Sequence, residues 1–289
     1  LAWFRDWVNT CEVGVSHRDA CAKLMADIDM SSLCHPADDS KGVAELSWSP
    51  ISNTTAPIFM WRGQFDGNGK TISNLYINAT SDYQGLFGYG LSNDENIKGV
   101  IKNLTLANVN VKNTAGCTGA LIGRADNFGI TQVVISSGTV EGEISAVGGI
   151  CGQADTESKF LSCENRAQIK SQTDITNNIG GICGNVNSSH IEKCANYGNI
   201  NSQGVYVGGI CGSSFGSSSI TTSANYGDIV GNNSVGGIIG YASNASISNS
   251  LTTGDVKSIT VVAGFVIGCC YNAITLSNTV AYNSGATLT

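Results

Sequence analysis

The sequence predicts an all-β fold, a three-sided parallel β-helix with about 28 residues in each rung. Three observations lead to this prediction. The apolar, glycine-rich word VGGICG ends at Gly152 and again at Gly212, and it returns as IGGICG ending at Gly184 and as VGGIIG ending at Gly240. A second word returns with the same period, and no helical period of 3.6 residues is sustained over 85–289. Such repetition is typical of a solenoid, because each repeat buries its apolar face only by stacking on its neighbours.

The first glycine of each word sets the period. Successive intervals are 29, 32, 28, 28 and 28 residues, counted along Gly119, Gly148, Gly180, Gly208, Gly236 and Gly264. A β-propeller blade needs about 40–45 residues, so this interval is too short for that alternative. No helix and no GK[ST] follows any of the words, which argues against a phosphate loop. We expect these glycines to serve tight corners and close backbone approach between rungs.

The second word supplies the remaining strands of each rung. It reads FLSCENRAQI (160–169), IEKCANYGNI (191–200), ITTSANYGDI (220–229), ISNSLTTGDV (247–256) and, more weakly, LSNTVAYNSG (276–285). Each repeat therefore holds three short apolar segments bounded by Gly, Asn and Ser, which indicates three strands. Equivalent residues of successive rungs then lie above one another at about 4.8 Å, so each repeated residue becomes a column.

The chain is predicted to form a single domain over 1–289. In LAWFRDWVN, the apolar Trp3, Phe4, Trp7 and Val8 lie on one face of a short helix that is placed to cap the open end of the solenoid. Residues 1–60 form this cap and a loop-rich region around the strand-like KLMADIDM. Strand-like segments at 63–78 and 100–111 begin the first rungs over 61–118, and regular repeats fill 119–289.

The order of these words resembles that of the GLUG-motif repeat proteins, which are bacterial surface and secreted proteins. The resemblance rests on the series CAKLMADIDM, SWSPI, GQFDGNGKTISNLYIN, GLFGYG, IKNLTLANVNV and the repeated VGGICG…CANYGNI, and it runs from about Trp3 to the end of the chain. It implies a right-handed β-helix that is exported and adhesin-like, and it supplies no catalytic residues. The chain departs from the family pattern in its many cysteines and in the insertion at 11–47.

Composition excludes two classes of partner or location. The chain has 15 Lys and Arg against 22 Asp and Glu, a net charge of -7, which leaves no basic stripe for nucleic acid. The longest apolar run near the end, ITVVAGFVIGCC (259–270), is shorter than the roughly 18 residues of a membrane span, so no transmembrane segment is predicted. The last rung ends without a polar cap, and we expect the chain to be part of a longer one.

Two columns at the second corner are candidates for stability and for binding. The first contains Asn165, Asn196 and Asn225, whose stacked amides are expected to hydrogen-bond from rung to rung. The second, one residue later, has an arginine and a threonine in the same slot as three tyrosines, which predicts an exposed column. Its tyrosines offer an apolar face and a polar tip to a glycan or a cell-surface protein, although they could equally be ordinary corner residues. This second column consists of Arg166, Tyr197, Tyr226, Thr253 and Tyr282.

Ten of the 11 cysteines fall into three groups. Cys11, Cys21 and Cys34 flank the irregular N-terminal loop, where one disulfide bridge is expected because it would close a long loop in an exported protein. Cys269 and Cys270 are adjacent and could form a vicinal disulfide. The remaining group occupies repeat positions that hold Ile or Ser in other rungs, which favours buried thiols; it contains Cys151, Cys183, Cys211, Cys163 and Cys194.

Candidate catalytic and metal-binding residues are few. Glu141 and Glu143 share one face of a strand about 6–7 Å apart, within the range of glycosidase acid pairs, but such residues are usually just solvated. Asp66 and Asn68 in FDGNGKTI form turn chemistry, with a calcium site as the alternative. No C-x-x-C pair supports zinc, and no cofactor is expected. The histidines lie far apart in the rung scheme, so no nucleophile and base pair is predicted.

These observations favour a non-catalytic, adhesin-like module, secreted or at the cell surface, that binds a glycan or a protein through a solenoid face. The first alternative is a polysaccharide-degrading enzyme, a lyase or a glycoside hydrolase, on the same scaffold. It would need acids clustered with Lys, Arg or His on one side, and the sequence offers no clear cluster of that kind. The second alternative is a structural spacer that holds another domain away from the cell.

Overall fold

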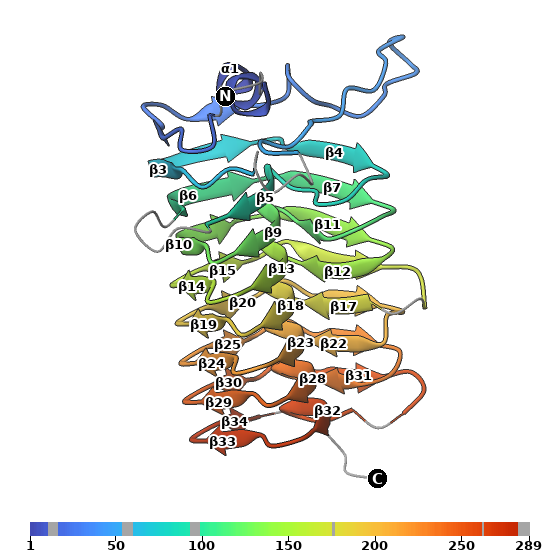
Figure 1. Ribbon diagram of the computed structural model, residues 1–289. Coiled ribbons are helices and arrows are strands. Elements are labelled where there is room, and N and C mark those ends of the chain that lie inside the picture. The colour runs from blue at the N-terminus through green and yellow to red at the C-terminus, as the bar shows by residue number, and fades with distance from the viewer. Residues whose placement is uncertain (11–16, 54–59, 93–98, 175–176, 262, 283–289) are drawn as a thin grey trace.

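The computed structural model describes residues 1–10, 17–53, 60–92, 99–174, 177–261 and 263–282. Strands form a parallel β-solenoid of about 6 turns with about 29 residues per turn, preceded by one short helix. This confirms the predicted all-β class, the parallel stacking and the period. Figure 1 shows the rungs following one another from the N-terminal cap to the C-terminal end, with each strand beside its equivalent in the next rung.

The strands belong to four parallel sheets, numbered here in the order in which a rung meets them. Sheet 1 contains β1 (Ala22–Lys23), β2 (Ile28–Asp29), β3 (Gln64–Ser73), β6 (Val100–Ala107), β10 (Gly129–Ile135), β14 (Lys159–Leu161), β15 (Glu164–Asn165), β19 (His190–Glu192), β20 (Ala195–Asn196), β24 (Ser219–Thr221), β25 (Ala224–Asn225), β29 (Ser246–Ser248), β30 (Leu251–Thr252), β33 (Thr275–Ser277) and β34 (Val280–Ala281). Sheet 2 contains β4 (Tyr76–Ala79), β7 (Val109–Asn113), β11 (Gly138–Gly142), β16 (Gln168–Ser171), β21 (Ile200–Ser202), β26 (Ile229–Gly231) and β31 (Val256–Ser258). Sheet 3 contains β8 (Thr118–Gly119), β12 (Ser145–Gly148), β17 (Asn177–Gly180), β22 (Tyr206–Gly208) and β27 (Val235–Gly236). Sheet 4 contains β5 (Phe87–Leu91), β9 (Ile122–Asp126), β13 (Cys151–Asp155), β18 (Cys183–Asn187), β23 (Cys211–Phe215), β28 (Ile239–Ser243) and β32 (Ile267–Tyr271).

The glycine word forms a corner between two strands and not a single strand. In the word that ends at Gly184, β17 ends at Gly180 and β18 begins at Cys183. A Cβ added at Gly181 would overlap the backbone of Gly209 in the next rung, so only glycine permits this approach. The predicted role of these glycines is therefore confirmed, and a rung crosses one more sheet than the three strands expected.

Apolar columns fill the interior, as the repeats predict. Ile169, Ile200 and Ile229 pair in register in sheet 2, and each is at most 1% exposed. In sheet 4, three cysteines pair in register and the column then continues with isoleucine, which confirms that these thiols are buried as small apolar residues. The members of that column are Cys151, Cys183, Cys211, Ile239 and Ile267.

The N-terminal helix α1 (Ala2–Asn9) caps the first rungs, as Figure 1 shows. Phe4 and Val8 are buried, and the Phe4 ring lies 6.0 Å from that of Phe65 in β3. The prediction that Trp3 and Trp7 share this inward face was wrong. Trp3 is 73% exposed and stacks on Trp7 at 5.4 Å, because a helix this short turns only one narrow stripe toward the rung beneath it. No helix of the described residues is long and apolar enough to span a membrane.

Candidate functional site

The corner after β15, β20 and β25 is held by the predicted asparagine ladder. Asn165 Nδ2 donates to Asn196 Oδ1 at 2.9 Å, and Asn196 Nδ2 donates to Asn225 Oδ1 at 2.8 Å. Asn225 Nδ2 in turn donates to the Thr252 hydroxyl at 3.3 Å, which ends the ladder. Each asparagine is fully buried and bonds the backbone two residues ahead, as in the bond from Asn196 Nδ2 to Gly198 O at 2.9 Å. Because the corner is fixed in this way, the residue after each asparagine turns outward.

The outward residues form the predicted exposed column. Tyr197 and Tyr226 stack with ring centroids 4.8 Å apart and ring planes inclined by 12°. The Arg166 guanidinium lies 4.1 Å from the Tyr197 ring centre and pairs with Glu164 at 3.0 Å. Both faces of Tyr197 are therefore covered, one by a cation and one by a ring. The far face of Tyr226 has no aromatic or cationic neighbour from its own column among the described residues, so this ring offers an open face, and the exposed Tyr282 stands apart from the stack.

Beyond Tyr226, the smaller side chain of Thr253 interrupts the column of aromatic residues. The backbone N–H of Thr253 donates to Asn225 O at 2.9 Å, and that of Tyr282 donates to Thr252 O at 2.8 Å, so both residues keep the register of the column. Tyr226 and Tyr282 are thus two rungs apart, about 10 Å at the usual strand spacing. Within the described residues, the Thr253 hydroxyl has no hydrogen-bond partner. We name the segment of this column at Thr253, between Tyr226 and Tyr282, the Thr253 slot.

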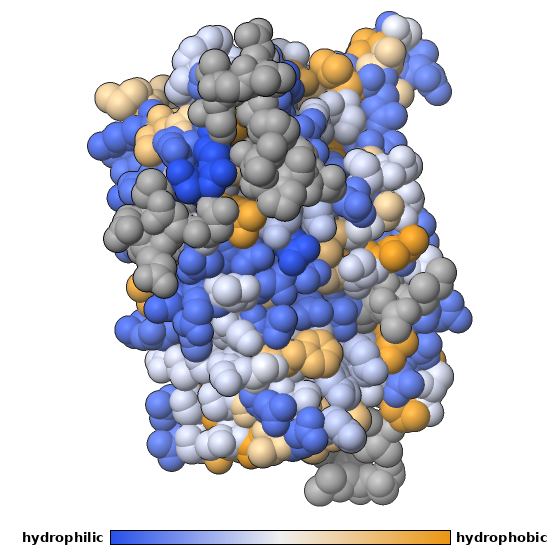
Figure 2. Space-filling view, viewed as in Figure 1, coloured by the Kyte–Doolittle hydropathy of each residue, from blue (hydrophilic) through white to orange (hydrophobic). Residues whose placement is uncertain are grey.

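Two carboxylates follow the column residues by two positions around the same corner. Asp228, two residues after Tyr226, is exposed, and its Oδ1 accepts the backbone N–H of Asp255 at 3.0 Å. Asp255 pairs with Lys257 at 3.5 Å. The surroundings of the slot therefore offer carboxylate and hydroxyl oxygens but little net positive charge. Figure 2 shows that the face of the solenoid in view is also largely hydrophilic, with scattered hydrophobic residues.

The predicted acid pair lies on sheet 2. The Glu141 side chain is only 15% exposed, and its Oε1 is 3.3 Å from Lys112 Nζ. Gln172 Nε2 also donates to Glu141 Oε1 at 3.4 Å. Glu143 follows the end of β11 by one residue and is partly buried. These contacts belong to an ion-paired strand residue, so a catalytic role for the two acids stays a prediction.

The predicted turn at Asp66 is a bulge within β3. Asn68 and Gly69 have φ values of +53° and +70°, and the pairing with β6 shifts register between Asp66 and Lys70. Asp66 Oδ1 accepts the backbone N–H of Asn68 at 2.8 Å and the Asn103 amide at 3.1 Å. These donors lower the pKa of the Asp66 carboxyl. Both donors bind Oδ1, one of the two carboxylate oxygens of Asp66, and no group of three metal-ligating His, Cys, Asp or Glu residues gathers in the described ranges.

The ten described cysteines are free thiols. Cys34 is buried and Cys21 is exposed, while Cys11 lies outside the described residues, so the bridge expected among these three is not confirmed. Cys269 and Cys270 are exposed and unbridged, so the vicinal disulfide is not confirmed either. In-register neighbours of a parallel pair sit about 4.8 Å apart, whereas a disulfide needs Cβ atoms about 3.8 Å apart, which explains why the buried columns remain thiols.

One cluster contradicts the expectation from the sequence that no histidine meets a nucleophile. His190, the first residue of β19, has its Nδ1 2.7 Å from Ser219 Oγ and its Nε2 3.2 Å from Glu157 Oε2. Pairing in register brings His190 beside Ser219, and the turn after β13 brings Glu157 to the other side. The words HIEKC and SITTS already align these two residues in the sequence, so the signal was present.

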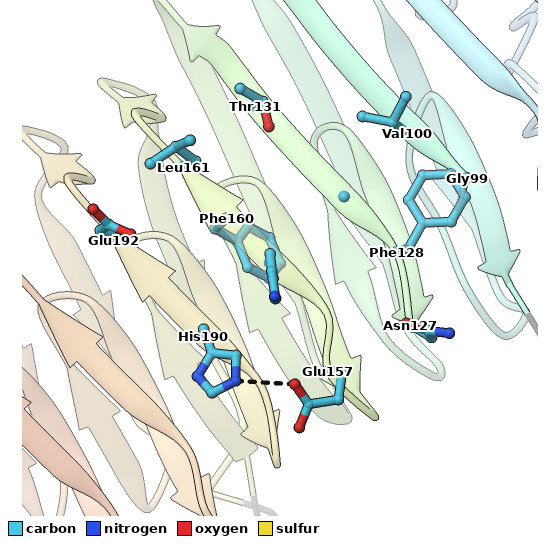
Figure 3. Close-up of a pocket in the computed structure, with 12 residues that line it drawn as sticks. Gly99, Val100, Asn127, Phe128, Thr131, Glu157, Phe160, Leu161, His190 and Glu192 are labelled. Atoms are coloured by element: carbon cyan, nitrogen blue, oxygen red, sulfur yellow. Dashed lines mark hydrogen bonds and ion pairs between the residues drawn. The ribbon is translucent and has the colours of Figure 1, made fainter. Parts of the chain in front are cut away.

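A groove of about 320 Å³ begins at this histidine. Gly129 lies in register between Val100 and Lys159 on the outer face of sheet 1, and its missing side chain opens the space. Figure 3 shows Glu157 and His190 pointing toward each other from neighbouring rungs at one edge of the groove. The residues along its apolar part are Val100, Phe128, Phe160 and Leu161.

Comparison with known sequences decides the nature of the repeat. Residues 231–257 match the family described as the GLUG motif. The chain contains the GLUG motif. The matched GLUG segment runs from the last residue of β26 into β31, which is one complete rung, and it includes the Gly236–Gly237 corner and the Thr252 end of the ladder. The resemblance drawn from the order of the words is therefore confirmed.

One curated protein and one solved structure are also similar to this chain. This GLUG-containing chain is 35% identical to halomucin from Haloquadratum walsbyi over 143 aligned residues, which make up 49% of the chain. The matched segment is 1% of halomucin, so the chain spans a very small part of that relative. A crystal structure from Bacteroides ovatus, described as a "putative immunoglobulin A1 protease", superposes with a TM-score of 0.66 over 92% of this chain and 79% of that one, at 22% identity. At this identity the likeness concerns the fold alone.

Proposed function

We propose that this chain is an extracellular, adhesin-like module that binds neutral glycans, with one sugar ring held in the Thr253 slot. The observation that carries the proposal is the stack of Tyr197 and Tyr226, which leaves the far face of Tyr226 open beside a threonine. Export is supported by the GLUG motif and by the similarity to halomucin. The finer assignment to a glycan rests on the chemistry of the slot.

The dimensions of the slot suit a sugar ring. A ring halfway between Tyr226 and Tyr282 would lie about 5 Å from each, which is within the 4.5–7 Å range of stacked rings. A pyranose offers apolar C–H groups on its faces and hydroxyls at its edge. The Thr253 hydroxyl can donate and accept, and the Asp228 carboxylate can accept, so both would serve the hydroxyls.

Charge selects among sugars. The carboxylates of Asp228 and Asp255 lie at the corner of the slot, and the chain carries a net charge of -7. An acidic sugar would meet like charge there. We therefore expect neutral hexoses and N-acetylhexosamines to bind more tightly than uronic or sialic acids. An arginine of a protein partner is the competing occupant, since Arg166 already stacks on the other end of the column.

Substitution of the interrupting residue tests the proposal. Thr253→Tyr restores the residue type of the neighbouring rungs and closes the slot while keeping the tyrosines. On an array of neutral and acidic oligosaccharides, we expect T253Y and Tyr226→Ala to lose at least about tenfold in affinity, on the order of one stacking contact. Tyr206→Ala, in a separate aromatic contact with Tyr241, is the control and should bind as wild type.

Two outcomes would contradict the assignment. Wild-type glycan binding by T253Y would show that the sugar lies elsewhere. Binding of arginine-containing peptides, with no binding of any oligosaccharide, would assign the slot to a protein partner instead. Circular dichroism of each variant establishes that the solenoid is intact before affinities are compared.

A further inference from the structure

Three side chains from three successive rungs form one hydrogen-bonded chain on the edge of sheet 1. Ser219 begins β24, His190 begins β19, and Glu157 lies in the turn after β13. Thr156 and Glu157 both have positive φ, +46° and +61°, and the Glu157 N–H donates to Ser188 O at 2.7 Å. This tight turn directs Glu157 toward the histidine, which is exposed enough to be reached from solvent.

The protons of this chain can be assigned from its acceptors. An ionised carboxylate can only accept hydrogen bonds. His190 Nε2–H is therefore the donor and Glu157 Oε2 the acceptor of the bond at 3.2 Å. In the neutral imidazole, Nδ1 is then the acceptor, and the Ser219 hydroxyl donates to it at 2.7 Å. The serine thus faces a base whose other nitrogen is held by a carboxylate. That is the arrangement of roles found in serine hydrolases, reached here with the two ring nitrogens exchanged.

A donor for developing negative charge lies on the next rung. Ser246 pairs in register with Ser219, one strand spacing further along the same outer face. Within the described part of the chain, the Ser246 hydroxyl has no hydrogen-bond partner, so it is available to an oxyanion formed at Ser219. On the other side, Lys159 pairs in register with His190. The outer column therefore orders a cation, a base, a nucleophile and a hydroxyl donor.

We propose that Ser219, His190 and Glu157 form a hydrolytic site that removes small acyl groups, such as acetyl, from the hydroxyls of a polysaccharide. The site is open, so the ester must be a small group carried on a large chain rather than a ligand enclosed in a pocket. A lone side-chain hydroxyl stabilises an oxyanion less than paired backbone N–H groups, which favours esters over the less reactive amides. The groove of about 320 Å³ that begins at His190 offers a surface on which the rest of the polysaccharide can lie.

The steps balance without any cofactor. Ser219 Oγ attacks the ester carbonyl while its proton passes to His190 Nδ1, and the oxyanion receives a hydrogen bond from Ser246. The C–O bond to the sugar then breaks, and the imidazolium returns the proton to the leaving alkoxide. Water, deprotonated by His190, attacks the carbonyl of the acyl-Ser219 ester. The bond from the acyl carbon to Ser219 Oγ then breaks, the carboxylic acid leaves, and the imidazolium returns its proton to Ser219 Oγ. Glu157 is a positioning residue, because it acts on the substrate only through the imidazole.

Hydrolysis of 4-nitrophenyl acetate by the full chain tests the proposal. We expect Ser219→Ala to lower turnover by roughly 10²-fold or more, to the uncatalysed rate, because it removes the nucleophile. Ser248→Ala, a change on the same sheet two residues after Ser246, should leave turnover unchanged. For His190→Ala, added imidazole should restore part of the rate, which a merely structural histidine would not show. Glu157→Gln should lower kcat with little effect on KM, and Glu157→Asp should recover part of that loss.

A covalent probe provides a second measurement, in which labelling of the wild-type protein is compared with labelling of the serine variant. A fluorophosphonate should add its mass to the peptide that contains Ser219, and to no equivalent amount in Ser219→Ala. Wild-type hydrolysis by Ser219→Ala, or wild-type protein that neither turns over the ester nor takes the label, would overturn the assignment. The site is independent of the Thr253 slot, so T253Y should keep full esterase activity even where it abolishes glycan binding.

Discussion

Gly181 lies directly against the side-chain amide of Asn196 inside a single rung. A Cβ added at Gly181 would overlap both Asn196 Cγ and the backbone oxygen of Gly209. The glycine word and the asparagine word of the repeat are therefore two sides of one contact. The same contact recurs in neighbouring rungs between Gly149 and Asn165, Gly209 and Asn225, and Gly237 and Thr252.

Gly181→Ala should destabilise the solenoid by about 3 kcal/mol, because the added methyl meets backbone and a fixed amide, and neither can move aside. Urea unfolding followed by circular dichroism measures the change. Gly129→Ala is the matched control, since its Cβ would lie 3.2 Å from Val100 Cγ2 on the outer face, where the side chain can yield. It should cost less than about 1 kcal/mol. Equal costs for the two variants would contradict the contact.

Asn196→Ala should cost about 4 kcal/mol, because it leaves several buried groups without partners. Asn196 Nδ2 donates to Gly198 O at 2.9 Å and to Asn225 Oδ1 at 2.8 Å, and its Oδ1 accepts from Asn165 Nδ2 at 2.9 Å. Asn199→Ala removes an exposed amide that accepts the Asp228 N–H at 3.0 Å, and it should cost less than about 1 kcal/mol. Unfolding in urea compares the two variants, because a difference in midpoint at equal dependence on urea concentration reports a difference in stability.

The cap helix offers a pair of aromatic variants that separate burial from size. Phe4 is 7% exposed and Trp3 is 73% exposed. Phe4→Ala should lower stability by about 3 kcal/mol, because it opens a cavity against Phe65. Trp3→Ala removes a larger side chain and should change stability by less than about 0.5 kcal/mol. Hydrogen exchange at the first rungs should rise only in the Phe4 variant, and a rise in both would contradict the arrangement.

The buried thiols predict a loss of stability in alkali. Burial raises the pKa of the Cys151 and Cys211 thiols, so the folded state holds their protons more firmly than the unfolded chain does. Their contribution is complete below the unfolded thiol value, about 8.5, and falls as the pH rises above it. Cys211→Ala should be less stable at pH 7 but should lose less between pH 7 and pH 10. Cys21→Ala, at an exposed position, should keep the wild-type pH dependence under reducing conditions.

The sequence was sufficient for the columns because stacking in register repeats the same environment every rung. Asn165, Asn196 and Asn225 could be recognised as a ladder from spacing alone, since a parallel solenoid places equal positions in contact. The exposure of Tyr197 and Tyr226 could be predicted because an arginine occupies the same repeat position in another rung. The coverage of their faces did not, because ring orientation depends on side-chain torsions that the pattern does not encode.

The proposed hydrolytic cluster could be predicted only in part from the sequence. Alignment of the repeats places Ser219 beside His190, but Glu157 comes from a turn with two residues at positive φ in a rung whose loop is longer than its neighbours. Irregular segments escape a periodic analysis for the same reason that they differ between rungs. The cap shows the limit as well, since the helical pattern of LAWFRDWVN did not reveal which of its aromatic residues would face the first rung.

The amide ladder also gives the molecule a chemical direction. Each of the three bonds between side chains from Asn165 to Thr252 runs from a donor in one rung to an acceptor in the next, always toward the C-terminal end. Aligned amide dipoles polarise one another, so the bonds reinforce each other along the series. The Thr252 hydroxyl accepts the last amide bond and has no amide group with which to continue the series, so it is the terminator of the ladder. Duplication of a repeat would lengthen this one-way series if inserted before the terminator, and would start a separate one if inserted after it.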